Sequence, residues 1–126
     1  AILAGAHLAV DCLDTIPARF LLEEACRKAG IPMVSAAIAG ANGQATVIFP
    51  SDPGLQQIYG APDKAPQKGI EASLGTLPFT AVYMAAAACA EISTILLGSP
   101  PELRHRLFFA DVRSHTSELL QQNPET

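Results

Sequence analysis

Two aspartates near the start of the chain have the spacing of a small oxygen-ligand site. Asp11 and Asp14 flank Cys12 and Leu13, and Arg19 follows. A carboxylate is an oxygen ligand suited to Mg²⁺, which takes few protein carboxylates together with phosphate oxygens. The stretch is therefore the strongest candidate for a nucleotide site. The spacing alone favours a simpler alternative, in which Asp14 only caps a helix.

The elements around these aspartates predict a place for them at the edge of a sheet. Residues 7–13 are a short apolar run, typical of a strand buried on both faces. A helix is predicted over residues 16–29, with Asp14 or Thr15 as its N-cap and Gly30 at its end. Ligands of open α/β sheets bind outside the carboxyl ends of the strands. In a straight strand the two aspartates would point to opposite faces, so only one would meet a nucleotide.

The predicted helix has an apolar side and a charged side. The apolar stripe consists of Phe20, Leu21, Leu22, Ala25 and Cys26. The side expected to face solvent consists of Glu23, Glu24, Arg27 and Lys28. A second strand over residues 33–38 completes a strand–helix–strand unit, which predicts a parallel pair with a right-handed crossover.

The remaining chain predicts a mixed sheet. Asn42-Gly43 is a two-residue turn signal, and the run that follows it to residue 49 is expected to pair antiparallel with the second strand. Residues 50–76 are rich in proline and glycine and predict a long irregular segment. Another strand is predicted over residues 104–111, with residues 113–120 as its hairpin partner.

Residues 78–97 form the longest apolar stretch and predict a helix that Gly98 ends. A membrane span is the alternative. Alanine content, the internal Glu91 and the lack of basic flanks favour a helix packed against the sheet. Glu91 is expected to be paired or at a contact between elements, because a lone buried carboxylate is costly.

Composition excludes several classes of function. The chain has 126 residues, of which 49% are hydrophobic and 16% charged, so it is expected to fold as one domain. The net charge of −4 and the low aromatic content argue against binding to nucleic acid or to an anionic membrane. Cys12, Cys26 and Cys89 form no CxxC pair, so we expect no zinc site. Three unpaired cysteines, expected to be buried and inert, indicate a reducing, cytoplasmic setting.

Four segments, in order along the chain, resemble the motifs of the ThiF/MoeB/HesA family. Residues 6–22 (AHLAVDCLDTIPARFLL) resemble the family's aDLVVDCTDNfetRylln stretch, and residues 29–48 (AGIPMVSAAIAGANGQATVI) resemble gIPlVsGaalGfeGQvtVf. The stretch from Gly69 to Gly98 resembles aGvlGp…qAlEaiKlLLG, and residues 107–111 resemble lLlfDa. The resemblance runs from about residue 3 to residue 120.

The resemblance implies the C-terminal half of a Rossmann-like α/β domain, in which a βαβ unit is followed by antiparallel strands and helices. Residues 1–126 would then be a single partial domain, with an irregular crossover loop at about 50–76. The family's glycine-rich phosphate loop belongs to the other half, and this sequence contains no GxGxxG. The piece alone is therefore expected to be inactive.

The family's activity is adenylyl transfer, and its members are related to ubiquitin-activating enzymes. The resemblance implies ATP and Mg²⁺ as cofactors and, as partner, a ubiquitin-like sulfur-carrier protein ending in Gly-Gly, for thiamine or molybdopterin synthesis. AMP would be joined to the carrier's C-terminal glycine carboxylate. A homodimer is implied as well. Two alternatives stay open: activation of another carboxylate, such as a peptide terminus or a tRNA-linked substrate, and a non-catalytic interaction domain.

Residue roles follow from the same resemblance. Asp14 and Arg19 match catalytic positions, and Asp14 would hold Mg²⁺ through ATP. The nucleotide-binding stretch would be Asp11, Cys12, Leu13 and Asp14, and the carrier-tail site would be Gly40, Gly43 and Gln44. The sequence departs from the family at Thr15, where asparagine is usual. It also lacks a cysteine within residues 50–76, so no covalent thioester is expected.

Overall fold

The chain folds around a five-stranded mixed sheet. The computed structural model describes residues 2–63 and 75–122. The strands are β1 (Ala9–Asp11), β2 (Met33–Ala39), β3 (Asn42–Ile48), β4 (Arg106–Asp111) and β5 (Thr116–Gln121). They lie in the order β1-β2-β3-β4-β5, and only β1 and β2 are parallel. The predicted mixed α/β fold, with its strand–helix–strand unit, is confirmed.

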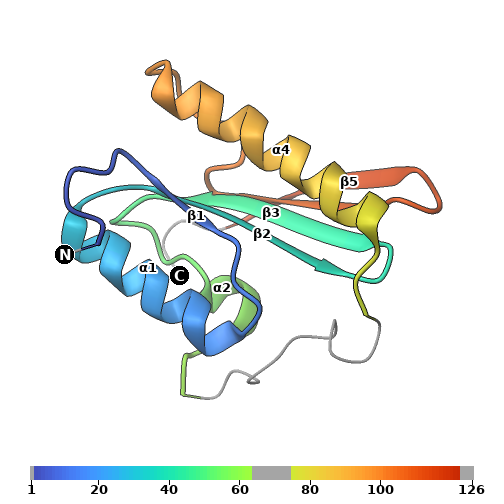
Figure 1. Ribbon diagram of the computed structural model, residues 1–126, viewed down its shortest axis with the longest axis horizontal. Coiled ribbons are helices and arrows are strands. Elements are labelled where there is room, and N and C mark those ends of the chain that lie inside the picture. Colours follow the sequence, from blue (N-terminus) through green and yellow to red (C-terminus); the bar gives the residue numbers. More distant parts are fainter. Residues whose placement is uncertain (1, 64–74, 123–126) are drawn as a thin grey trace.

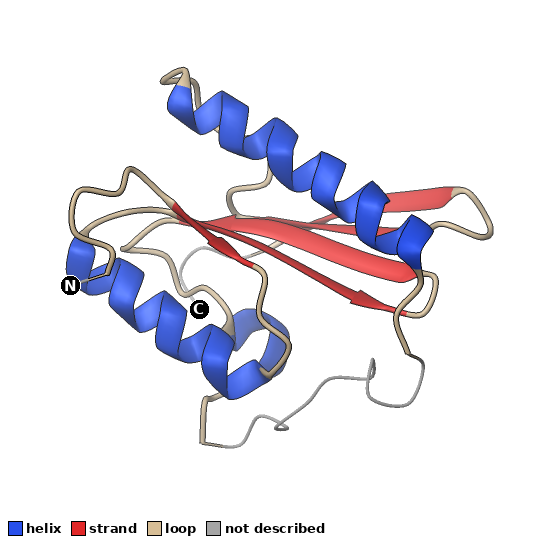
Figure 2. Ribbon diagram, in the orientation of Figure 1, coloured by secondary structure: helices blue, strands red, loops and turns tan. Residues whose placement is uncertain are grey.

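Helices cover the two faces of the sheet unequally. One face carries α1 (Ile16–Ala29) and the short α2 (Gln56–Tyr59), and the other carries α4 (Pro78–Leu96) (Figure 1). Figure 2 shows that the loops gather at the two ends of the strands. The hydrophobic core is likewise divided into two clusters, one on each face of the sheet. Val34, Val47 and Met84 lie in the cluster under α4, and Cys26, Met33 and Leu55 lie in the cluster under α1.

Helix α1 begins and ends at the predicted residues but buries a different face. Thr15 is the N-cap, since its Oγ1 accepts a hydrogen bond from the Ala18 N–H (3.3 Å), and so the capping role considered for Asp14 is wrong. Gly30 ends the helix in the left-handed conformation (φ 71°). Leu21 is 69% exposed, whereas Glu23 is buried. The Glu23 carboxylate accepts the Leu55 N–H (2.7 Å), a partner that helical periodicity cannot reveal.

Strand β1 is shorter than the predicted strand over residues 7–13. It ends at Asp11, whose own Oδ1 accepts the Leu13 N–H (3.0 Å) and so turns the backbone out of the sheet. Asp14 therefore lies beyond the strand. The expectation of opposite faces, which required a straight strand, does not apply.

The hairpin between β2 and β3 turns two residues earlier than predicted. Ala39 pairs with Asn42, so the loop residues are Gly40 and Ala41. Gly40 has a φ of 57°, at the first loop position, where a type II′ turn takes glycine. The Asn42-Gly43 pair belongs to β3 instead. A Cβ added at Gly43 would overlap the Met84 side chain, so this glycine allows α4 to approach the sheet.

Helix α4 packs one stripe on β2 and β3, as predicted. The buried stripe consists of Thr80, Met84, Ala88 and Glu91. The Glu91 carboxylate accepts the Leu103 N–H (3.0 Å), which confirms a paired role for this residue. Within the described residues, α4 is also the one helix whose length and apolar composition would suffice to cross a membrane, and 22% of that stretch is buried inside the structure.

The end of the sheet opposite Asp11 is fixed by a second arginine–aspartate pair. Arg104 donates to both oxygens of the buried Asp52 (2.9 and 3.1 Å) and lies over the Phe49 ring. Burial by itself would raise the pKa of Asp52. Hydrogen bonds from Arg104 and the Phe49 N–H, with the charges of Arg104 and His105, outweigh it and lower that pKa. The loop after β3 is thereby fixed.

Candidate functional site

The buried Asp11 carboxylate is the centre of the predicted site. Its Oδ2 accepts hydrogen bonds from Arg19 (2.8 Å) and from the Ser35 hydroxyl (2.8 Å). Its Oδ1 accepts the Leu13 N–H. Three donors satisfy a carboxylate that is 1% exposed. The hydrogen bonds of Asp11 therefore link β1 to β2, to α1 and to the turn after β1.

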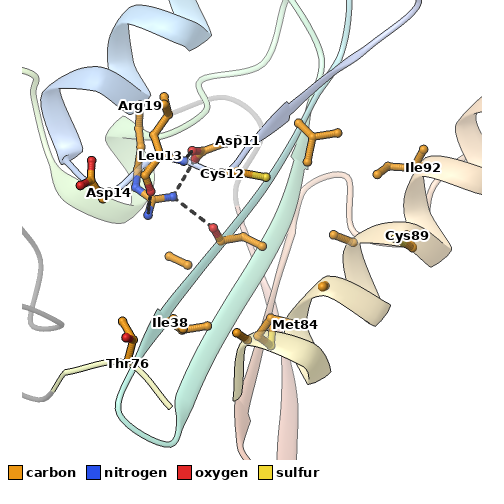
Figure 3. Close-up of a pocket in the computed structure, with 16 residues that line it drawn as sticks. Asp11, Cys12, Leu13, Asp14, Arg19, Ile38, Thr76, Met84, Cys89 and Ile92 are labelled. Carbon is orange, nitrogen blue, oxygen red and sulfur yellow. Dashed lines mark hydrogen bonds and ion pairs between the residues drawn. The ribbon is translucent and has the colours of Figure 1, made fainter. Parts of the chain in front are cut away.

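Arg19 forms hydrogen bonds with β1, with β2 and with the turn after β1, the same elements that Asp11 contacts. Its Nη1 donates to Asp11 and to the Ala36 carbonyl oxygen (3.1 Å), and its Nη2 donates to the Leu13 carbonyl oxygen (2.7 Å). Figure 3 shows the guanidinium between these groups. Arg19 occupies a buried position of α1, which places it at the end of β1. Its ion pair with Asp11 compensates the free-energy cost of burying both charges. Arg19 thus braces the turn that carries Asp14.

Asp14 is the free carboxylate of the group. Its side chain is exposed, and among the described residues it makes no hydrogen bond or ion pair. In Figure 3 it lies beside Leu13, apart from the bonded cluster of Asp11 and Arg19. A rigid turn that presents one unpaired carboxylate offers a ligand to a hard cation. This suits Mg²⁺, which needs one or two carboxylates and takes its other ligands from water and phosphate.

A cavity of about 400 Å³ opens beside this turn, between the ends of β1 and β2 and the inner side of α4. Ligand sites of small molecules have volumes of this order. Asp11, Asp14 and Arg19 line its polar end. The remaining lining is mostly apolar: Val10, Ala36, Ala37, Ile38, Ala81, Met84, Ala85, Ala88 and Ile92, with Leu13 and Thr76 at the margin. The cavity can therefore take a ligand with one charged and one apolar part.

The three thiols differ from the expectation that all are buried. Cys12 and Cys89 are exposed and line the cavity, the first from the turn after β1 and the second from α4 (Figure 3). Only Cys26 is buried, and burial, together with the charge of Glu23, raises the pKa of its thiol. The apolar neighbours that suggested buried thiols at Cys12 and Cys89 are instead the lining of the cavity.

The structure does not gather the predicted carrier-tail residues on one surface. Gly40 is tied to the segment before α4, because its N–H donates to the Gly75 carbonyl and its own carbonyl accepts the Thr80 hydroxyl (2.8 Å). Gly43 lies under Met84. Gln44 points to the opposite face, where its Nε2 donates to the Tyr59 hydroxyl (3.1 Å).

Two residues of the site were not predicted. Ser35 reaches Asp11 because the two are direct partners in the parallel register of β1 and β2. A sequence reading that aligned these strands would have placed them side by side. Thr76 borders the cavity because its segment bridges to Gly40, a contact between distant loops that no local pattern signals.

Comparison with known proteins places this arrangement in a family. A sequence model of the ThiF family matches residues 1–126. The SAMP-activating enzyme E1 of Haloferax volcanii is 33% identical over 129 aligned positions, which cover 98% of this chain and 47% of that protein. The chain thus spans about half the length of this relative.

Solved structures agree on the fold. PaaA superposes with a TM-score of 0.63 at 11% identity, over 95% of this chain and 36% of PaaA. Escherichia coli MccB, solved with AMPCPP and MccA, superposes with a TM-score of 0.63 at 12% identity, over 94% of this chain and 38% of MccB. At these identities the likeness concerns the fold alone. The family match over the whole chain is the stronger finding, and it shows that the chain belongs to the ThiF family.

Proposed function

We propose that this chain is part of an ATP-dependent adenylyltransferase that activates the C-terminal glycine of a ubiquitin-like sulfur-carrier protein ending in Gly-Gly. The observation that carries the proposal is the exposed Asp14 carboxylate, which has no partner among the described residues and lies at the rim of a cavity, on the turn that the buried pair of Asp11 and Arg19 holds. Membership of the ThiF family and the relative described as a SAMP-activating enzyme support this chemistry. Thiamine and molybdopterin synthesis are the proposed settings.

Asp14 is the proposed ligand of Mg²⁺. When bound, the ion would neutralise charge on the ATP phosphates and so favour departure of pyrophosphate. The described residues contain no group of three His, Cys, Asp or Glu side chains that could hold a metal alone. A single carboxylate fits an ion that reaches the site with the nucleotide, because phosphate oxygens then supply further ligands.

Arg19 and Asp11 are proposed to act through the turn rather than on the nucleotide. All the groups that they hold lie within residues 11–14 or on β2. Rigid placement matters because the charge that develops around the α-phosphate during adenylyl transfer would be stabilised mainly by preorganised charge. Arg19, predicted as catalytic from the resemblance, is therefore proposed as a positioning residue. Cys12 and Leu13 contribute the wall beside the nucleotide.

The direct test is ATP–pyrophosphate exchange by the full-length protein, with and without a small carrier that ends in Gly-Gly. The proposal expects exchange only with the carrier. A carrier with its terminal glycine amidated is the matched control, because it lacks only the carboxylate. Exchange that requires a peptide or a tRNA-linked carboxylate instead would contradict the carrier assignment. No exchange with any carboxylate would contradict the enzymatic function.

Assembly and location complete the proposal. Helix α4 exposes Phe79, Val82 and Tyr83, of which Tyr83 stacks on Phe108 of β4, and these exposed apolar side chains support association with a second copy. We propose a cytoplasmic homodimer, in keeping with its free thiols. Light scattering of the full-length protein should give twice the subunit mass, and a monomer at micromolar concentration would contradict the dimer.

A further inference from the structure

Strand β2 extends beyond its parallel neighbour β1, and this leaves part of its edge without a partner strand. The pairing of the two strands ends where Asp11 faces Ser35. Strand β2 continues to Ala39, and its other side pairs with β3 throughout. No strand of the described part of the chain pairs with residues 36–39 on the side of β1. This stretch is an open edge inside the sheet.

The even-numbered residues of β2 direct their backbone N–H and C=O groups toward that edge. Backbone groups of successive residues in a strand point alternately to its two neighbours. The Pro32 carbonyl, directly before β2, accepts the Ala9 N–H of β1 (3.0 Å), so residue 32 points to the side of β1. By the same alternation Ile38 directs both its N–H and its C=O to that side.

Ile38 is the unpaired position of this edge. On one side of it, the Ala36 carbonyl accepts a hydrogen bond from Arg19 (3.1 Å). On the other side, the Gly40 N–H donates to the Gly75 carbonyl (2.9 Å). Within residues 2–63 and 75–122, no backbone or side-chain group closes the edge at Ile38. One backbone donor and one backbone acceptor are thus open side by side.

The cavity surrounds this open position. Ile38 and its neighbour Ala37 both line the cavity, although successive side chains lie on opposite faces of a strand. Ile38 packs against the cluster under α4. Ala37 lies on the other face, because its direct partner Gln44 bonds to α2. A cavity lined from both faces reaches around the edge between them, so a ligand in it can lie against the backbone of Ile38.

We propose that the open edge of β2 at Ile38 binds the main chain of an extended peptide, close to the carboxylate that is activated. A free N–H and C=O on one edge residue match the C=O and N–H of one residue of an antiparallel peptide. The inference rests on the adenylyl transfer of the proposed function. It names the substrate class as a peptide carboxylate, rather than a carboxylate carried by a tRNA nucleoside.

The surroundings of the open position set the direction of the peptide. Thr76 lies at the end of the edge where Gly40 forms its bridge. Asp14 lies at the other end, on the turn that Arg19 ties to β2 (Figure 3). A peptide with its carboxylate at Asp14 therefore enters past Thr76 and runs antiparallel to β2. Because both ends of the edge are occupied, only one peptide residue pairs with it.

The test replaces single amide N–H groups of the substrate by ester oxygens, a change that leaves the enzyme intact. Peptides with the last six residues of the carrier carry one ester each, and their KM is measured in ATP–pyrophosphate exchange by the full-length protein. An ester at the paired residue should raise the KM about 3–10-fold, the effect of one hydrogen bond. The ester one residue earlier is the matched control. It should change the KM by less than about twofold, because that N–H points away from β2.

A pair of variants tests the same contact from the enzyme. Ile38→Pro removes the open N–H, and proline is tolerated there because the lost N–H faces the unpaired edge. Ile38→Ala keeps the N–H and loses a similar part of the side chain, so it is the reference. The KM for the peptide should be at least about threefold higher in Ile38→Pro than in Ile38→Ala, with equal KM for ATP. Thermal unfolding of both variants shows that they fold.

An intact carrier with the same ester separates two sources of the peptide chain. An equal rise in KM for carrier and peptide would identify the carrier's tail as the occupant. A rise for the free peptide alone would support the edge as a peptide site and remove the carrier from the proposed function.

Two outcomes of the exchange measurements would overturn the inference. One is an ester series with the same KM at every position. The other is exchange with a tRNA-linked carboxylate at a kcat/KM equal to that of the peptide.

Absence of exchange with every carboxylate would contradict the proposed function, and peptide binding then decides the inference separately. Fluorescence anisotropy measures binding of the ester series to the full-length protein with a non-hydrolysable ATP analogue. Weaker binding at one ester position would support the open edge as a peptide site without the reaction. Equal binding across the series, or none, would overturn the inference as well.

Discussion

Buried aspartates bind arginines at both ends of this sheet, but the two pairs stand in different surroundings. At one end Asp11 and Arg19 hold the turn after β1. This turn presents Asp14, which has no ion-pair partner among the described residues, beside a cavity of about 400 Å³. At the other end Asp52 and Arg104 hold the loop after β3. There Arg104 lies on the Phe49 ring, and Arg27 donates to the carbonyls of the same loop.

The contrast indicates what distinguishes the proposed functional site from a purely structural ion pair. A buried ion pair is present in both places, so it does not by itself indicate function. The difference is a free ligand next to a space that a substrate can enter. At the Asp11 end, substitutions should therefore be able to reduce activity without reducing stability. At the Asp52 end, substitutions should reduce stability alone.

The largest expected effect is on activity at Asp14. Asp14→Ala in the full-length protein should slow pyrophosphate exchange by roughly 10²–10³-fold, since it removes the proposed Mg²⁺ ligand. The free energy of unfolding should change by less than about 0.5 kcal/mol, because the side chain is exposed and unpaired among the described residues. Glu24→Ala, at another exposed carboxylate, is the control for both measurements. A wild-type exchange rate in Asp14→Ala would remove this residue from the site.

The next effect is on stability at Arg19. Arg19→Met should lower the free energy of unfolding by about 3–5 kcal/mol, because Asp11 is left buried without its ion-pair partner. Adding Asp11→Asn should recover part of that loss by removing the buried charge. Exchange should remain low in the double variant, because the turn has still lost its brace. Chemical denaturation measures the first effect, and recovery of exchange together with stability would refute the positioning role.

A smaller effect is expected where β3 meets α4. Gly43→Ala should cost about 1–3 kcal/mol, because the new methyl group overlaps Met84, which also lines the cavity. Met84→Ala in the same background should be less destabilising than in the wild type. A thermodynamic cycle of unfolding free energies measures this coupling. If Gly43 instead contacts the carrier tail, Gly43→Ala would raise the carrier KM without loss of stability.

The smallest effect is expected at Asp52 and depends on pH. Asp52→Asn should cost about 1–2 kcal/mol at neutral pH, since it weakens the bonds to the partly exposed Arg104. The pKa of Asp52 is lowered in the folded state, so the stabilisation is complete above its ordinary value of 3.8 and is lost as the pH falls through the lower folded value. Urea denaturation at neutral pH and below pH 3.8 should show a smaller pH dependence in Asp52→Asn. A reduced exchange rate in this variant would break the contrast between the two ends.

The sequence predicted the elements well where local signals dominate. Thr15 and Gly30 bound α1 at the expected limits because caps act on their own neighbours. The antiparallel pairing of β2 and β3 was predicted correctly, but the position of their turn was wrong because two turn signals compete. Gly40 at the first loop position supplies the positive φ, while the Asn42-Gly43 signal is overridden by the pairing of Ala39 with Asn42.

The site was predictable in part. The structure places the predicted stretch from Asp11 to Asp14 along one cavity, and its role in binding a nucleotide stays a prediction. The sequence did not show that Asp11 and Arg19 bond to each other while Asp14 is exposed. That arrangement depends on where β1 ends and on which residue Arg19 contacts in the folded chain. The burial of Glu23 was missed for the same reason: the Leu55 N–H lies 32 residues away in sequence.

The most direct test measures carrier-dependent ATP–pyrophosphate exchange by the wild-type full-length protein and by its Asp14→Ala and Asp52→Asn variants in one experiment. The account predicts exchange in the wild type and in Asp52→Asn at similar rates, and a loss of at least about 10²-fold in Asp14→Ala. Equal rates in Asp14→Ala and the wild type, or an equal loss in both variants, would contradict the assignment of the active site to the Asp11 end of the sheet.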